Sequence, residues 1–212
     1  MNTAHPSAAA TPSPAERSAR QAAVVQALSH AVPAHALLWN AEDTTPYECD
    51  GLTAYRQRPL VVVLPETHDQ VQAVLQTCHR LGVPVVARGA GTGLSGGAMP
   101  NAMGVTLSLA KFNQILHIDP VGRTAVVQCG VRNLAISEAA APYGLYYAPD
   151  PSSQIACTIG GNVAENSGGV HCLKYGLTLH NVLQVQGFTA EGEAITFGSQ
   201  ALDAPGYDLL AA

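Results

Sequence analysis

Residues 88–98 read RGAGTGLSGGA, a run of eleven residues that contains five glycines. Within it, Gly91, Gly93 and Gly96 match the pattern G-x-G-x-x-G, which is the dinucleotide-binding fingerprint of the Rossmann fold. That fingerprint has to follow the first strand of a βαβ unit and open its helix. The neighbours of this stretch therefore decide between a Rossmann fold and another architecture that holds a phosphate.

Two apolar segments precede the glycine stretch, and each predicts a buried strand. PLVVVLP at 59–65 is a β-branched run bounded by prolines, and VPVVARG at 83–89 is similar. Between them, Thr67 and Gln70 have the spacing of a capping box, and Gly82 is placed to end a helix. The sequence therefore predicts a βαβ unit with parallel strands, and the glycines follow its second strand.

The residues after the glycine stretch also argue against a Rossmann site. LSGGAMPNAMG at 94–104 contains further small residues and a proline, so we expect no helix there. About 20 positions further on, LAKFN at 109–113 offers no carboxylate for a ribose. We therefore expect a loop whose backbone N–H groups hold a phosphate, although an ordinary tight loop is the alternative.

A second glycine-rich run, TIGGNVAENSGG, follows at 158–169. Thr158 and Asn162 add polar side chains to its glycines, and we expect a second loop of the same kind. Two phosphate-binding loops in one domain suit a single long cofactor with two phosphates.

The rest of the chain predicts short helices and strands, which gives an α+β fold class. Ser13 and Glu16 form a capping box for a helix that runs to about His30, and 40–58 is irregular and polar. Further on we expect strands at 104–109, 113–119 and 124–130, a helix at 131–144 ending at Gly144, and a hairpin over 181–199 with the turn AEGE.

Composition excludes several classes of protein. The 212 residues are 47% hydrophobic and 12% charged, which is typical of a folded globular chain, and the net charge of −5 gives no basic footprint for nucleic acid. Five cysteines without a C-x-x-C pair fit a reducing compartment, so we expect a cytoplasmic protein. No run approaches the roughly 18 apolar residues of a membrane helix, and the first residues do not form a secretory signal. The histidines have no metal-ligand spacing, so no metal site is expected.

Three segments in this order resemble the FAD-binding domain of the vanillyl-alcohol-oxidase type: LPET, RGAGTGLSGGA and YYAPDPSSQIACTIGGNVAENSGGVHCLKYG. Within that family the likeness is strongest to the FAD-linked D subunits of bacterial glycolate oxidases, and it covers roughly residues 30–210. The resemblance implies two α+β subdomains with FAD between them, not a Rossmann fold. The expected division is a disordered lead at 1–12, a helix and irregular segment at 13–54, and subdomains at about 55–110 and 111–212.

The resemblance also implies which residues surround FAD. The first glycine loop resembles the cradle of the pyrophosphate, and the second glycine run resembles a second cradle. The stretch 149–152 resembles the part near the isoalloxazine ring, and 185–188 resembles the strand at the adenine end. The implied cofactor-binding residues are Arg88, Gly89, Ala90, Gly91, Thr92, Gly93, Ser95, Gly96, Pro149, Asp150, Ser152, Thr158, Gly160, Gly161, Asn162, Ala164 and Gln186.

Some relatives tether FAD through a histidine just after the arginine of the first loop. Here Gly89 follows Arg88, and 88–98 contains no histidine, so we expect non-covalent FAD. His171 is the one histidine near the expected flavin, and a surface or packed role is the alternative to a catalytic one. Asp150 lies between two prolines, and it either orients flavin or substrate or shapes a turn.

The resemblance finally implies a function. We expect the FAD-binding part of a flavin-dependent 2-hydroxy-acid dehydrogenase of the glycolate or D-lactate type. The family continues past GYDLLAA at 206–212 into a glycine-rich segment and a substrate cap domain, so we expect this part to be incomplete, without catalytic residues and inactive alone. A second flavin subunit and an iron–sulfur subunit are the implied partners, at the surface of the inner membrane. A non-catalytic FAD or nucleotide-binding module and an NADPH-dependent flavin reductase of the same fold stay open.

Overall fold

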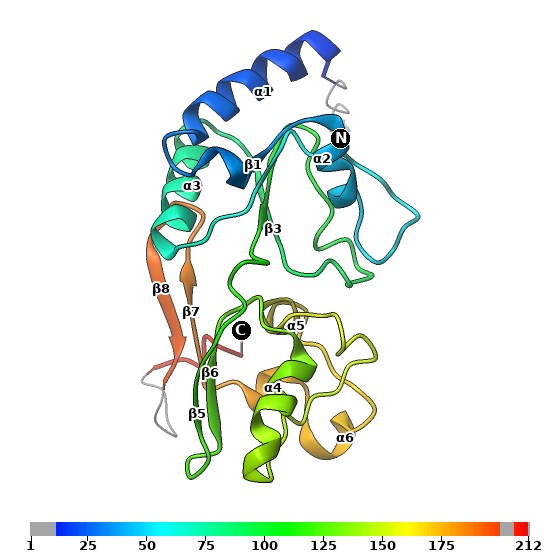
Figure 1. The fold of residues 1–212 in the computed structure, drawn as a ribbon, viewed down its shortest axis with the longest axis vertical. Coiled ribbons are helices and arrows are strands. Elements are labelled where there is room, and N and C mark those ends of the chain that lie inside the picture. Colours follow the sequence, from blue (N-terminus) through cyan, green and yellow to red (C-terminus); the bar gives the residue numbers. More distant parts are fainter. Residues whose placement is uncertain (1–11, 200–205, 212) are drawn as a thin grey trace, which may run out of the picture.

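The computed structural model describes residues 12–199 and 206–211, which form an elongated molecule of two lobes (Figure 1). The first lobe holds a four-stranded sheet with helices α1 and α3, and the second holds two two-stranded sheets with helices α4, α5 and α6. The expected lead at 1–12 lies, except for its last residue, outside the described residues.

The sheet of the first lobe has the strand order β1-β2-β4-β3, in which β2, β4 and β3 are parallel and β1 is an antiparallel edge. The predicted βαβ unit is confirmed, with β4 inserted between the two strands that α3 connects. Arg88 pairs with Ser108, so the glycine loop leaves the sheet beside the end of β4. The elements of this lobe are α1 (Pro14–Leu28), η1 (Ala34–Ala36), β1 (Leu37–Leu38), α2 (Ala41–Thr44), η2 (Thr45–Tyr47), β2 (Val61–Val63), α3 (His68–Arg80), β3 (Val85–Arg88) and β4 (Val105–Ser108).

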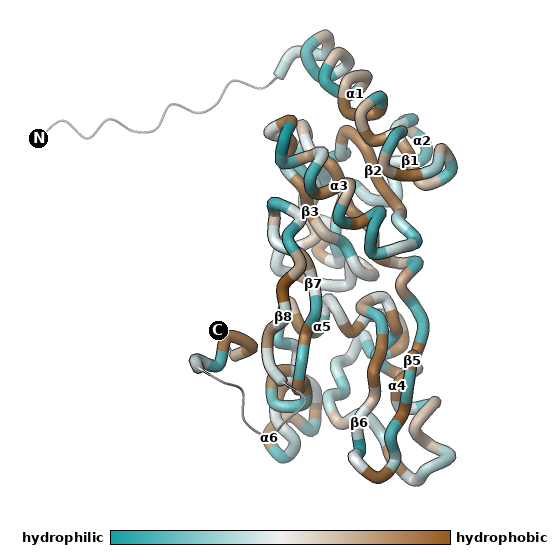
Figure 2. Tube along the Cα trace, turned by 90° about the vertical axis from the view of Figure 1, so that its left-hand side faces the viewer, coloured by the Kyte–Doolittle hydropathy of each residue, from teal (hydrophilic) through white to brown (hydrophobic). Residues whose placement is uncertain are grey.

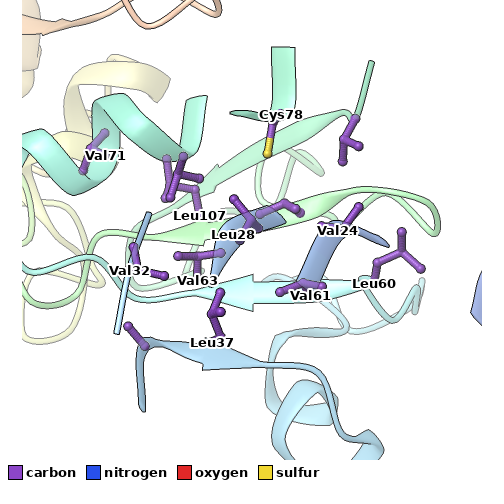
Figure 3. Close-up of a cluster of buried hydrophobic side chains, with 14 of the residues drawn as sticks. Val24, Leu28, Val32, Leu37, Leu60, Val61, Val63, Val71, Cys78 and Leu107 are labelled. Atoms are coloured by element: carbon purple, nitrogen blue, oxygen red, sulfur yellow. The ribbon is translucent and has the colours of Figure 1, made fainter. Parts of the chain in front are cut away.

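One hydrophobic core holds the first lobe together. Val24 and Leu28 of α1 meet Val61 and Val63 of β2, and Val74 of α3 belongs to the same buried cluster (Figure 3). Strand β2 is hydrophobic throughout, as its brown colour in Figure 2 shows, because both of its faces are buried. Burial of each such side chain contributes about 1.5–3 kcal/mol, so this core fixes the sheet from which the glycine loop extends.

The capping box at Ser13 and Glu16 is confirmed. The capping box expected for α3 is only half right. The Thr67 hydroxyl accepts from the Gln70 amide at 3.2 Å, but the Gln70 side chain accepts from the Glu66 amide at 2.7 Å instead of returning to Thr67. The long side chain of Gln70 reaches one residue further back than the motif requires.

The segment 40–58 is more regular than expected. It contains α2 and η2, and the short strand β1 precedes it. Elements of two to four residues are too short to show a hydrophobic period, so the sequence pattern does not reveal them.

The second lobe confirms the expected hairpins at 113–130 and 181–199. The helix expected to run to Gly144 ends at Ala140 as α4, and the 3-10 turn η3 continues from it to the cap residue Gly144, whose φ is 68°. The expectation of a loop at 158–169 is wrong, because residues 159–165 form helix α5. The first turn of α5 requires a glycine at position 160, because a Cβ there would lie 2.8 Å from Cβ of Cys129. The elements are β5 (Ile115–Asp119), β6 (Thr124–Val127), α4 (Asn133–Ala140), η3 (Ala141–Tyr143), α5 (Ile159–Glu165), α6 (Cys172–Tyr175), η4 (Thr178–Asn181), β7 (Gln184–Phe188) and β8 (Ala194–Gly198).

The β7–β8 hairpin connects the two lobes, and its turn lies beside α3 in Figure 1. The Gln72 side chain of α3 donates to the carbonyl of Gly192 at 2.8 Å. Phe188 packs against the core of the first lobe. The hairpin therefore holds the lobes in a fixed relation along one side of the molecule.

Candidate functional site

The glycine loop leaves β3 and contains no helix up to β4, as the sequence predicts. Gly91 and Gly96 have φ values of +72° and +82°, a region that L side chains rarely adopt. The loop is therefore built on glycine for conformational reasons. Because no helix begins here, a Rossmann site is excluded.

A neighbouring segment at 48–52 braces this loop. The buried carboxylate of Asp50, 4% exposed, accepts from the amide of Gly96 at 2.8 Å and from the amide of Leu52 at 2.9 Å. The amide of Gly51 donates to the carbonyl of Gly93 at 2.9 Å. The loop is thus preformed by contacts within the protein, and sequence reasoning missed Asp50 because no local pattern links it to the loop.

The Arg88 side chain lies beneath the same loop. Its guanidinium donates to the carbonyl of Cys49 at 2.8 Å and lies 5.7 Å from the centre of the Tyr47 ring. A Cβ at Gly91 would overlap the guanidinium. Arg88 therefore supports the loop from the brace side, and Gly91 leaves the space that it needs.

Thr158 joins the second glycine segment, residues 158–169, to the first, residues 88–98. Thr158 is the N-cap residue of α5, yet its side chain makes no capping bond. A Cβ at Gly89 would overlap the Thr158 hydroxyl, and one at Gly161 would lie 3.7 Å from it. The two glycine segments therefore meet at this hydroxyl, where one lobe faces the other.

Two buried polar atoms of this segment have no hydrogen-bond partner among the described residues, Oγ1 of Thr158 and Nδ2 of Asn162. Thr158 is 8% exposed and Asn162 is 3% exposed. A buried polar group without a partner costs about 1–3 kcal/mol, so native proteins rarely keep one without a ligand or water. These two side chains, together with the preformed glycine loop, fit a phosphate-bearing cofactor such as FAD.

The stretch 149–152 lies on the second lobe. The carbonyl of Pro149 accepts from Asn133 at 3.1 Å, and the carboxylate of Asp150 lies 2.6 Å from Nδ1 of His171. This hydrogen bond holds the pKa of Asp150 below its usual value, with a smaller contribution from the His171 amide. Asp150 therefore does more than shape a turn, because it orients the His171 ring.

The other expected site residues lie on the β7–β8 hairpin, in a turn, on α5 and in the glycine loop. Gln186 pairs with Thr196 in the β7–β8 hairpin with an exposed side chain, and no hydrogen bond joins it to either glycine segment in the described part of the chain. Ser152 lies in a turn and Ala164 on α5. The loop itself carries the remaining ones, which are Ala90, Thr92 and Ser95.

The described residues lack both a membrane-spanning helix and a metal-binding cluster. Within 12–199 and 206–211, no helix is long and apolar enough to cross a membrane. No group of three or more His, Cys, Asp and Glu side chains in the same ranges could hold a metal ion.

Comparisons with known proteins show the family to which the chain belongs. A family model described as an FAD binding domain matches residues 59–198. Glycolate oxidase subunit GlcD of Escherichia coli K12 is 66% identical over 188 residues, 89% of this chain and 38% of that protein. D-lactate dehydrogenase of Archaeoglobus fulgidus is 39% identical, over 71% of this chain and 34% of that protein. This chain thus spans little more than a third of their length.

Solved structures show the same fold. An alkyldihydroxyacetonephosphate synthase superposes with a TM-score of 0.73 at 21% identity, over 85% of this chain and 34% of that one. Together with the family model, this likeness confirms the expected α+β fold class of the vanillyl-alcohol-oxidase type. From the family model and the identity to its relatives, the chain belongs to the FAD-binding domain family.

Proposed function

We propose that this chain binds one FAD without a covalent bond, across its two glycine segments. The observation that carries the proposal is the buried, unpartnered hydroxyl of Thr158 where the two segments meet. Membership of the FAD-binding domain family supports it. The absence of histidine from 88–98 supports a cofactor that is held by contacts alone.

The chain's own residues have distinct roles in this proposal. Backbone N–H groups of 89–96 bind the pyrophosphate, because glycine lets the backbone come close to phosphate oxygens. Thr158 and Asn162 donate from the second segment, where Gly160 and Gly161 leave room. The stretch 149–152 and Gln186 are proposed to lie along the flavin and adenine ends, as the resemblance implies.

We further propose that the chain is the FAD-binding part of a longer 2-hydroxy-acid dehydrogenase. Relatives that it matches bear the names glycolate oxidase subunit and D-lactate dehydrogenase. Bound FAD would accept the hydride from the 2-hydroxy acid, while this chain binds and orients the cofactor. We assign no catalytic residue to this chain.

The word subunit in the name of the Escherichia coli relative supports assembly with other chains. We propose a second flavin subunit and an iron–sulfur subunit as partners, which would place the complex at the inner membrane surface.

A cofactor-retention experiment tests these proposals. The purified chain is incubated with FAD, desalted, and its visible absorbance is recorded before and after anaerobic addition of glycolate, D-lactate and NADPH. We expect retained yellow colour that none of the three bleaches. Loss of all colour on desalting would overturn the FAD site. Bleaching by glycolate or D-lactate would show that the catalytic parts are present, and bleaching by NADPH would favour a flavin reductase.

A further inference from the structure

Glu165, the last residue of α5, faces the first glycine segment from the opposite lobe. A Cβ at Gly97 would lie 2.8 Å from its Oε1, and a Cβ at Gly93 would lie 3.2 Å from the same atom. The carboxylate therefore lies against the loop between these two glycines. The sequence does not single out Glu165, because only the meeting of the two lobes brings it to the loop.

The charge of Glu165 is not neutralised by a neighbour. The ion pairs between described residues are His35–Glu66, Arg56–Glu48 and His171–Asp150, and none includes Glu165. Arg88, the cation of the loop itself, donates to the carbonyl of Cys49 on the brace side. A carboxylate is negatively charged at neutral pH, so the loop faces an uncompensated negative charge.

Helix stability does not explain this placement. Acidic side chains stabilise the first turn of a helix and are unfavourable in the last turn, where the carbonyl groups already concentrate negative potential. Glu165 stands at the last helical position, followed by Asn166 in the left-handed conformation. Its position therefore points to a role toward the loop that it contacts.

We propose that Glu165 lowers the affinity of the glycine loop in the cofactor site for phosphate anions, whichever ligand carries them. This inference rests on the proposed FAD function. The Coulomb energy between two charges a few ångströms apart is significant even in water and rises near a protein surface. The penalty is the same for every ligand bound through its phosphates, and FAD can offset it through the contacts that we propose along the second segment.

The test compares wild type with Glu165→Gln, which removes the charge at nearly constant size. Isothermal titration calorimetry with FAD and with ADP at low ionic strength gives the dissociation constants. We expect the variant to bind both ligands about three- to tenfold more tightly. At 1 M salt the Debye length falls to about 3 Å, so the difference should shrink.

Glu138→Gln is the matched control, because Glu138 is an exposed residue of α4 in the same lobe. It changes the net charge equally and should leave both dissociation constants unchanged. Glu165→Ala, as a second variant, should change affinity in the same direction as Glu165→Gln.

The outcomes separate this inference from the function on which it rests. FAD binding of equal strength by wild type and Glu165→Gln overturns the inference and leaves the FAD site intact. Weaker FAD binding by the variant also overturns it, because Glu165 would then be a ligand. No FAD binding by either protein overturns the proposed function and the inference together.

Discussion

The two glycine segments differ in how far contacts within the protein satisfy their polar groups. The first is held by the protein itself, since Asp50 and Gly51 bond to its backbone and Arg88 lies beneath it. The second is a short helix, and it presents Thr158 and Asn162 with buried polar atoms that lack partners. The first segment is therefore organised in advance, whereas the second keeps buried polar atoms available for the ligand that we propose.

Removing the brace should have the largest effect. Asp50→Ala leaves the amides of Gly96 and Leu52 without their acceptor in a partly buried place. We expect a loss of about 2–4 kcal/mol in the free energy of unfolding, measured by urea denaturation. FAD affinity should fall about tenfold, because the loop is no longer preformed.

Asp119→Ala is the control for this change. The Asp119 carboxylate also accepts from two backbone amides, those of Val121 and Gly122, but in the exposed turn between β5 and β6. It should cost much less stability and leave FAD affinity unchanged. Equal effects of the two variants on FAD affinity would show that Asp50 does not organise the loop.

Thr158→Val should raise the stability of the chain without FAD and lower its affinity for FAD. It removes a buried hydroxyl that has no partner, so the free energy of unfolding without FAD should rise by about 1 kcal/mol. FAD affinity should fall about three- to tenfold, because a hydrogen bond to the cofactor is lost.

Thr106→Val is the matched control, since its hydroxyl is also buried and unpartnered but belongs to β4 in the first lobe. It should stabilise the chain without changing FAD affinity. Unchanged FAD affinity in Thr158→Val would remove this residue from the site.

The smallest expected effect concerns Asp150 in the second lobe, outside both segments. His171→Gln removes the ring that lowers the pKa of Asp150, so NMR titration should show that pKa rising toward its ordinary value of about 3.9. A carboxyl group whose pKa is lowered in the folded state stabilises the fold at pH values above its ordinary pKa. This stabilisation disappears as the carboxylate protonates, so the variant, which has less of it, should lose less stability on acidification below about pH 4.

The pKa of Asp119 serves as an internal reference in the same spectra. It is lowered by the backbone amides of Gly122 and Val121, which His171→Gln does not touch. A pKa of Asp150 that stays as low as in wild type would show that His171 is not the cause.

Local patterns predicted the first segment well and the second poorly. PLVVVLP and the breakers after Gly93 sufficed to place a loop after the second strand of a βαβ unit. Gly160 and Gly161 are typical of a loop, yet the chain is helical there, and Gly160 serves close packing on Cys129 instead of a loop conformation. Asp50 and Glu165 could not be predicted, because their roles arise from tertiary contacts that no spacing in the sequence encodes.

Amide hydrogen exchange with and without FAD tests most directly whether both segments hold one cofactor. We predict that FAD slows exchange in peptides that cover 89–97 and in peptides that cover 158–166, with the larger change in the second segment. The turn at 120–123, far from both, should exchange at the same rate in either state. Protection of only one segment, or of neither, would contradict the account.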